Sequence, residues 1–165
     1  MTEQHTDELA DFLCQQYLCE SLTVKEVRTL LDYLSLVNLT PGDVIADVGE
    51  VGEALYFVVR GEAALMSTSG PEAVEIGRVG AGEMMGEMSF FDRKPRSVRM
   101  VADGKETQVL KLTRTMYQRL RVEHPYIAVN LLEHAIVSLD QLFRSVTSDV
   151  SVLNQYFYGV GGGRR

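Results

Sequence analysis

The most informative stretch of this chain reads Gly82-Glu-Met-Met-Gly-Glu-Met-Ser-Phe-Phe-Asp-Arg-Lys-Pro-Arg-Ser-Val-Arg-Met-Val-Ala102. Gly86 allows a backbone conformation that other residues rarely adopt, and residues 87–91 can then form a single helical turn. The free N–H groups of such a turn point at whatever lies in front of it. Because these groups attract negative charge, we expect an anion site at this turn.

The residues just after this turn complete a pocket. Pro95 fixes the backbone before Arg96, and the alternation from Ser97 onward predicts a strand that can face the turn. A guanidinium, a hydroxyl and several amide N–H groups then meet at one point, which describes a phosphate pocket. Glu87 gains nothing from a phosphate beside it, but its carboxylate can accept hydrogen bonds from the hydroxyls of a sugar. The segment therefore predicts a site for a phosphate together with a sugar.

Two sequence patterns, one helical and one β-prone, describe the chain before and around this segment. From about Glu8 to Val37 apolar residues recur at helical spacing, which predicts two helices, and Thr23-Val-Lys-Glu26 forms a capping box between them. From Pro41 to about Leu112 glycines separate short β-prone runs. Many short strands with frequent turns predict a β-sandwich or a β-roll.

Two more helices are predicted after the β region, over residues 115–122 and then from Pro125 to about Ser148. The second helix carries two apolar faces, and one repeats at the steps of a coiled coil. We expect one face to pack on the roll and the other on the same helix of a second subunit; the alternative is a helix half sunk in its own domain. The first face contains Ala128, Leu132, Ala135, Leu139, Leu142 and Val146, and the second contains Ile127, Leu131, Ile136 and Phe143.

In this order the segments resemble the cyclic nucleotide-binding domain family, which is found in catabolite-activator-type regulators and in the regulatory subunits of cyclic-AMP-dependent kinase. The upstream part, Pro41-Gly-Asp-Val-Ile45 and Gly49-Glu-Val-Gly-Glu-Ala-Leu-Tyr-Phe-Val-Val-Arg-Gly61, is similar to the family's paired-hairpin signature. The downstream part, Gly86-Glu-Met-Ser-Phe-Phe91 and Pro95-Arg-Ser97, is similar to its phosphate-binding cassette. The resemblance runs from about Leu36 to Phe143.

This resemblance implies a mainly β fold: a jelly-roll-like β-roll, or double-stranded β-helix, flanked by N-terminal helices and a C-terminal lid helix. We accordingly divide the chain into an N-terminal helical segment (1–37), the β-roll (38–113), hinge and lid helices (114–148) and a tail (149–165). The last residues, from Gly159 to Arg165, are expected to be a flexible basic tail.

The resemblance also implies a role for each matching residue. Glu87 would bind the ribose 2′-hydroxyl and Arg96 would pair with the cyclic phosphate. The backbone N–H groups beside Gly86 would complete the anion cradle, and an apolar strand residue would contact the base. The cradle residues are Met88, Ser89 and Ser97, and the residue at the base is Val79.

Four residues depart from the family pattern. Met85 replaces a common aromatic residue, Phe90 and Phe91 are bulkier than the usual aliphatic residues, and Arg99 stands where a small or β-branched residue is frequent. The aromatic residues bear on the size of the pocket. Arg99 can add positive potential, which would suit a ligand more highly charged than a cyclic mononucleotide.

The expected function is a sensor that binds cyclic AMP or cyclic GMP, with a cyclic dinucleotide left open, and no other cofactor. The signal would pass through movement of the lid helix to an unidentified protein partner or through self-association. The alternative is a ligand-free scaffold in which Glu87 and Arg96 form a structural salt bridge or face solvent.

An enzyme is not expected. A metal-dependent cupin needs several ligands on its strands, whereas His5, His124 and His134 all lie outside the predicted roll. Cys14 and Cys19 have no plausible base beside them, cannot supply a four-thiolate cluster, and are placed poorly for a disulfide. We therefore predict no catalytic and no metal-binding residues.

Charge and hydropathy bear on location and partners. The net charge of −7 disfavours binding to DNA, and only about twenty residues follow Phe143, where relatives place a helix-turn-helix. No secretory signal opens the chain, and no apolar run approaches the roughly 20 residues that span a bilayer. A reduced, cytoplasmic setting without membrane insertion is the expectation.

Overall fold

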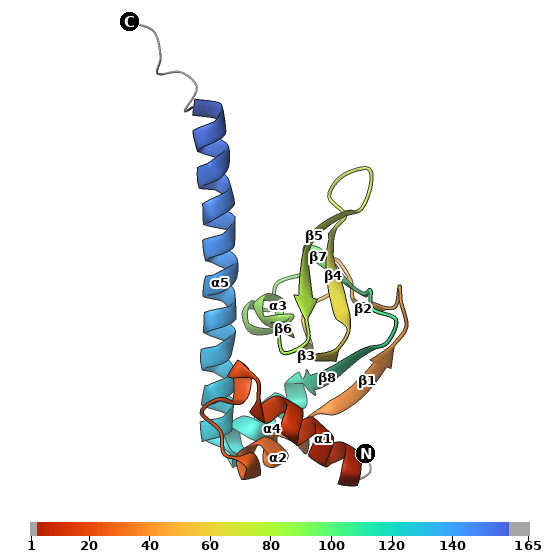
Figure 1. Ribbon diagram of the computed structural model, residues 1–165, viewed down its shortest axis with the longest axis vertical. Helices are drawn as coiled ribbons and strands as arrows, with labels where there is room; N and C mark the ends of the chain where they lie inside the picture. Colours follow the sequence, from red (N-terminus) through yellow and green to blue (C-terminus); the bar gives the residue numbers. More distant parts are fainter. Residues whose placement is uncertain (1–2, 159–165) are drawn as a thin grey trace, which may run out of the picture.

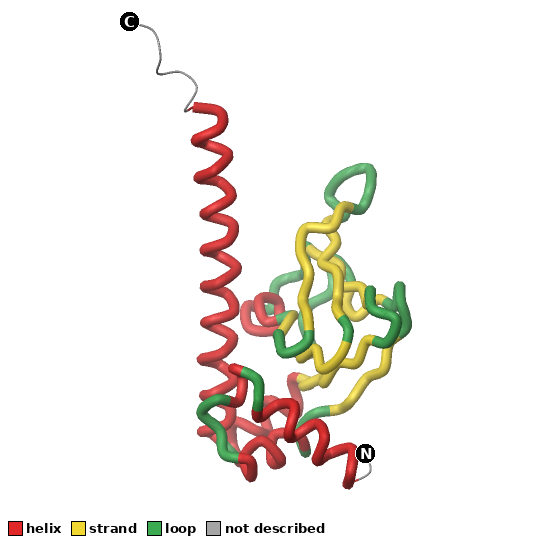
Figure 2. The backbone as a smooth tube through the Cα atoms, viewed as in Figure 1, coloured by secondary structure: helices red, strands yellow, loops and turns green. Residues whose placement is uncertain are grey.

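The computed structural model describes residues 3–158, with the backbone alone for 3, 142, 143 and 145–158. Two four-stranded antiparallel sheets form the expected β-roll (Figure 2). One sheet has the order β1 (Ser35–Leu39), β8 (Thr107–Thr113), β3 (Ala54–Arg60) and β6 (Met84–Met85). The other has the order β2 (Val44–Ala46), β7 (Val98–Ala102), β4 (Glu62–Ser67) and β5 (Val74–Gly80).

The helices gather mainly at one end of the roll (Figure 1). A long helix, α5, rises from this group and passes the roll, with α3 between the two (Figure 1). The elements outside the sheets are α1 (Glu3–Cys14), the 3₁₀ turn η1 (Tyr17–Cys19), α2 (Val24–Leu31), α3 (Glu87–Asp92), α4 (Arg114–Glu123) and α5 (Pro125–Tyr158). The predicted arrangement of N-terminal helices, roll and C-terminal helices is confirmed.

Strand β3 connects two apolar cores because both of its faces are buried. Leu55 and Phe57 point toward the helices and pack with residues of α1, α2 and α4. Tyr56 and Val58, on the other face, join the core inside the roll. A strand that alternates between two cores reads as a continuous apolar run, as residues 54–59 do.

The N-terminal helical segment is shorter than expected. The capping box is present, since Thr23 N–H donates to Glu26 Oε2 at 2.8 Å and Glu26 N–H donates to Thr23 Oγ1 at 3.3 Å. However, α2 ends at Leu31, and residues expected to be helical up to Val37 form β1 instead. Strand β1 pairs with β8, with Ser35 opposite Lys111. Pairing with a distant strand overrides a local apolar spacing that fits either structure.

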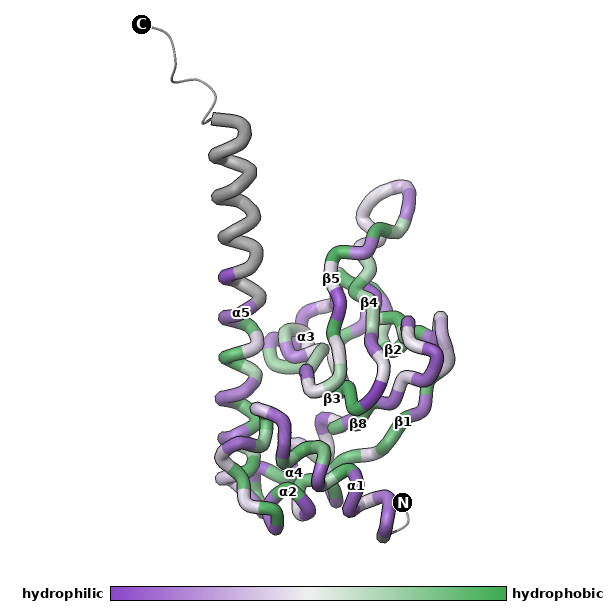
Figure 3. Tube along the Cα trace, in the orientation of Figure 1, coloured by the Kyte–Doolittle hydropathy of each residue, from purple (hydrophilic) through white to green (hydrophobic). Residues whose placement is uncertain are grey.

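The last helix is longer than expected and buries a different face. It continues to Tyr158, so the predicted tail begins ten residues too early, and residues 159–165 lie outside the described part. Hydropathic colour alternates along its described part (Figure 3). The buried residues come from both predicted faces, and one residue of each face, Leu132 and Ile136, is exposed. The four buried residues instead follow the 3.6-residue period of a single helix face. Buried are Ile127, Ala128, Leu131 and Ala135; exposed are Tyr126, Val129, Leu132 and Ile136; the side chains of Leu142, Phe143 and Val146 are outside the described set.

Candidate functional site

The predicted turn is present as α3, a helix of six residues. Gly86 stands just before it with φ of 92°, in the left-handed region that favours glycine. A Cβ at this position would lie 3.3 Å from the carbonyl oxygen of Ala54 and 3.3 Å from Nη2 of Arg96. Glycine therefore allows the guanidinium of Arg96 to lie beside the N-terminal end of the turn.

The turn is held in place from the loop before β3. Ser89 Oγ accepts a hydrogen bond from Gly52 N–H at 2.7 Å and donates one to the carbonyl of Lys94 at 2.6 Å. A Cβ at Gly52 would lie only 2.6 Å from the backbone nitrogen of Phe90, so this close approach requires glycine. The hydroxyl of Ser89 is thus engaged within the protein, which leaves its backbone N–H for a ligand.

Arg114 ties the other end of the turn to α4, which the sequence did not predict. Its guanidinium donates to the carbonyl of Phe90 at 2.7 Å and to that of Gly52, and it lies 4.5 Å from the centre of the Phe90 ring. It also forms an ion pair with Glu53 at 3.3 Å. These contacts fix the cassette against the helical end of the roll.

Arg96 is 8 % exposed, yet its guanidinium has neither a hydrogen bond nor an ion pair with any described residue. Its backbone is firmly placed: the N–H donates to the carbonyl of Glu50, and its carbonyl accepts from Gly49 N–H, both at 2.8 Å. A buried charge without a partner is costly. The position is therefore suited to an anion that supplies the missing partner.

Glu87 is also 8 % exposed, but it has a partner. Ser138 Oγ, on α5, donates to Glu87 Oε1 at 2.8 Å. Burial raises the pKa of the Glu87 carboxyl, and its hydrogen bonds and the charge of Arg96 act in the opposite direction. Among the described residues no ion pair joins Glu87 to Arg96, so the salt bridge expected for a scaffold is not formed.

The remaining predicted site residues differ in how far they are exposed to solvent. Met88 is 61 % exposed, and Ser97 is exposed directly after Arg96. Val79 is buried in the core inside the roll together with Met85, the residue before Gly86. The structure thus brings the cassette residues and Arg96 together, with Val79 on the apolar side.

Two residues that depart from the family pattern, Arg99 and Phe90, do not affect the site as the sequence suggested. Arg99 adds no free positive charge to the site, because Asp47 accepts from its Nε at 2.7 Å and from its Nη2 at 3.1 Å. This pairing lowers the pKa of Asp47 and raises that of Arg99. Phe90 is fully buried in the helical core and packs edge-on against Tyr117, so its bulk does not enter the roll.

The histidines and cysteines lie away from this site. The three histidines are on or next to helices, outside both sheets. Both cysteines are free, and burial raises the pKa of the Cys19 thiol to about 12. In the described part of the chain no three His, Cys, Asp or Glu side chains gather as metal ligands. None of the described helices is long and apolar enough to cross a membrane.

Comparison with known proteins agrees with the fold. The family described as "Cyclic nucleotide-binding domain" matches residues 36–124, which is more than half of the chain. This chain therefore belongs to the cyclic nucleotide-binding domain family.

The similar proteins include regulators of the catabolite-activator type. The cyclic AMP receptor protein of Thermus thermophilus is 35 % identical over 115 residues, covering 69 % of this chain and 53 % of the receptor. This chain thus spans about half the length of that relative. The crystal structure of the Thermus thermophilus catabolite activator protein has a TM-score of 0.68 at 30 % identity, covering 83 % of this chain and 62 % of the other.

A cyclic nucleotide-binding domain from Methylobacillus flagellatus is similar over a larger share of both chains. Its crystal structure has a TM-score of 0.77 and covers 89 % of this chain and 83 % of the other. At 24 % identity, this likeness bears on the fold alone.

Proposed function

We propose that this chain is a regulatory, non-catalytic module that binds a cyclic nucleotide, cyclic AMP or cyclic GMP, at the cassette. The observation that carries the proposal is Arg96, a residue that is nine-tenths buried and whose guanidinium has no hydrogen bond or ion pair with any described residue and lies beside the N-terminal end of α3. A cyclic phosphate supplies the missing negative charge and accepts hydrogen bonds from the guanidinium and from the free N–H groups of the turn.

The other residues of the site have complementary roles. The Glu87 carboxylate accepts a hydrogen bond from the ribose 2′-hydroxyl, and its second oxygen remains free for Ser138. Val79 offers apolar surface to the base. The backbone N–H groups of Met88, Ser89 and Ser97 complete the phosphate cradle. This assignment is supported by the similarity to a protein named as a cyclic AMP receptor.

The signal leaves the site through α5. Ser138 connects this helix directly to the carboxylate that binds the sugar. A ligand that changes the hydrogen bonding of Glu87 therefore changes what holds the helix against the cassette, and the helix position follows. Exposed apolar residues on α5, such as Val129, Leu132 and Ile136, are a surface for a second copy of the chain or for a protein partner.

The competing proposal is a scaffold that binds no nucleotide. Of the two arrangements expected for it, the ion pair between Glu87 and Arg96 is absent among the described residues, and the other, an Arg96 that faces solvent, is tested by the titration below. We also propose a cytoplasmic location, in keeping with two free cysteines.

Isothermal titration of the protein with cyclic AMP, cyclic GMP and cyclic di-GMP, in parallel, tests the proposal. Saturable binding of a cyclic mononucleotide that is lost when Arg96 is replaced supports it. A folded protein that releases no heat with any of the three would overturn it and favour the scaffold.

A further inference from the structure

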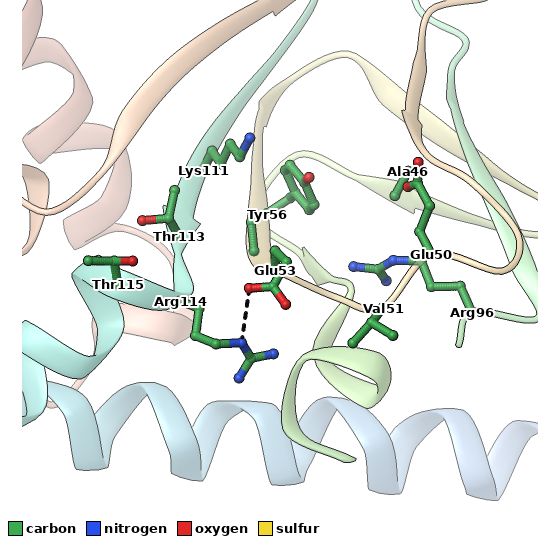
Figure 4. Close-up of a pocket in the computed structure, with 11 residues that line it drawn as sticks. Ala46, Glu50, Val51, Glu53, Tyr56, Arg96, Lys111, Thr113, Arg114 and Thr115 are labelled. Carbon is green, nitrogen blue, oxygen red and sulfur yellow. Dashed lines mark hydrogen bonds and ion pairs between the residues drawn. The ribbon is translucent and has the colours of Figure 1, made fainter. Parts of the chain in front are cut away.

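Arg96 also borders a cavity that the cassette does not account for. This cavity has a volume of about 540 Å³ and lies where β3 and β8 meet the start of α4, with the loop before β3 as another wall (Figure 4). Of the seven residues predicted to bind the nucleotide, Arg96 alone lines it. Its volume falls in the range of roughly 300–1,000 Å³ that is usual for sites of small molecules.

Three cations and two carboxylates line this cavity, so one positive charge is in excess. Of the two carboxylates, Glu53 forms its ion pair with Arg114, and Glu50 accepts a hydrogen bond from Asp47 N–H at 2.9 Å. The side chains of Arg96 and Lys111 form no hydrogen bond or ion pair with any described residue. Both line the cavity, and Arg96 is nine-tenths buried. The cavity is therefore built to receive an anion.

The other walls suit a ligand larger than an inorganic ion. The ring of Tyr56 and the side chain of Val51 provide apolar surface (Figure 4). The hydroxyl of Thr113 accepts from Met116 N–H at 3.3 Å and keeps its own hydrogen for donation, and Thr115 offers a second hydroxyl. A charged end, two hydroxyls and an apolar wall match the chemistry of a phosphorylated sugar.

We propose that this cavity is a second anion-binding site, which takes a phosphate monoester of about the size of a sugar phosphate. Its phosphate binds between Lys111 and Arg96, and its sugar contacts the threonine hydroxyls and Tyr56. Lys111 lies on β8 directly opposite Tyr56 on β3, whereas Glu87 does not line the cavity. The site is therefore defined by Lys111 and does not depend on nucleotide binding at the cassette, but because Arg96 is shared, a phosphate bound to Arg96 from one ligand competes with the other.

The test is an NMR titration of the ¹⁵N-labelled protein with ribose 5-phosphate and, separately, with inorganic phosphate, at constant ionic strength. The amide signals of Val51, Thr113 and Thr115 report on the cavity. Lys111→Met keeps the apolar stem and removes the charge, and Lys111→Arg restores a cation. Lys105→Met is the matched control, because Lys105 is exposed and does not line the cavity.

We expect saturable shifts of these amides with ribose 5-phosphate and weaker binding of inorganic phosphate. Loss of one charge-assisted contact weakens binding by about tenfold or more, so Lys111→Met should show this loss, Lys111→Arg should recover most of it, and Lys105→Met should match the parent protein. Absence of saturable shifts, or equal affinity in the Lys111→Met and Lys105→Met proteins, would overturn the proposal. Equal affinity for both anions would overturn the part that assigns a sugar phosphate. Titration of the same variants with cyclic AMP separates this outcome from a failure of the cassette.

Discussion

Replacement of Arg96 by methionine should change stability and affinity in opposite directions. Methionine keeps the length of the side chain but removes the charge. Burial of an unpartnered polar group costs about 1–3 kcal/mol, and more for a charged one. Because Arg96 borders a cavity of about 540 Å³, water there hydrates part of the guanidinium, and we expect the lower end of that range. The ligand-free variant should therefore unfold with a free energy about 1 kcal/mol higher, or a Tm about 2–4 °C higher.

Affinity for the nucleotide should fall in the same variant. A hydrogen bond to a charged group contributes about 1.5–3 kcal/mol, so loss of the guanidinium weakens binding by about tenfold to a hundredfold. Urea denaturation without ligand measures the first effect, and isothermal titration with cyclic AMP and cyclic GMP measures the second.

Arg99 provides a matched control because it lies three residues further along and is already paired. It is 40 % exposed and bound to Asp47. Replacement of Arg99 by methionine should lower stability by at most about 1 kcal/mol, as for other exposed ion pairs, and should change affinity by less than about threefold. If the Arg96 variant were the less stable of the two and bound nucleotide as tightly as the parent, the assignment of Arg96 as an unpaired ligand-binding charge would be wrong.

Three further predictions concern the residues around this centre. Burial raises the pKa of Glu87, so the native state holds the proton of this carboxyl more tightly than the unfolded state does. Stability therefore falls as the pH rises from the ordinary pKa of 4.5 through the raised pKa. Glu87→Gln should flatten this pH dependence in urea denaturation, and an unchanged slope of stability against pH would contradict the assignment. The hydrogen bond from Ser138 lowers the pKa of Glu87, so Ser138→Ala should raise it further in a ¹³C NMR titration of that carboxyl, and a fall would exclude the contact. Gly52→Ala places a Cβ 2.6 Å from the backbone nitrogen of Phe90 and should lower the free energy of unfolding by about 1–3 kcal/mol. Gly70→Ala is the control, because a Cβ there would lie 3.8 Å from its nearest neighbour, and it should change stability by no more than about 0.5 kcal/mol in the same denaturation assay. Equal effects of the two substitutions would refute the close packing of the cassette.

Sequence reasoning succeeded where structure depends on near neighbours. The capping box at Thr23 and the turn after Gly86 are set within a few residues, and both are present. Their signals are chemical, since a hydroxyl accepts from a nearby N–H and glycine adopts a positive φ. Local chemistry was sufficient to predict the capping box and the turn after Gly86.

Features that depend on distant pairing were not predictable. Strand β1 exists because it pairs with β8, more than 60 residues away. The partners of Arg99, Arg114 and Ser138 are likewise brought together only by the folded chain. A single sequence shows that these side chains can form hydrogen bonds, but not with which partner. The place of Lys111 in the cavity was unpredictable for the same reason, because the cavity is formed by segments far apart in the chain.

The continuity of α5 gives the molecule a mechanical lever. The helix has 34 residues and, at about 1.5 Å per residue, is ~51 Å long. Ser138 stands only ~20 Å from the end that begins at Pro125, by the same rise. If the helix tilts as a rigid rod about that end, a displacement of ~1 Å at Ser138 becomes ~2.5 Å at the far end. The exchange of a single hydrogen bond at Glu87 could in this way be converted into a movement large enough for another protein surface to detect.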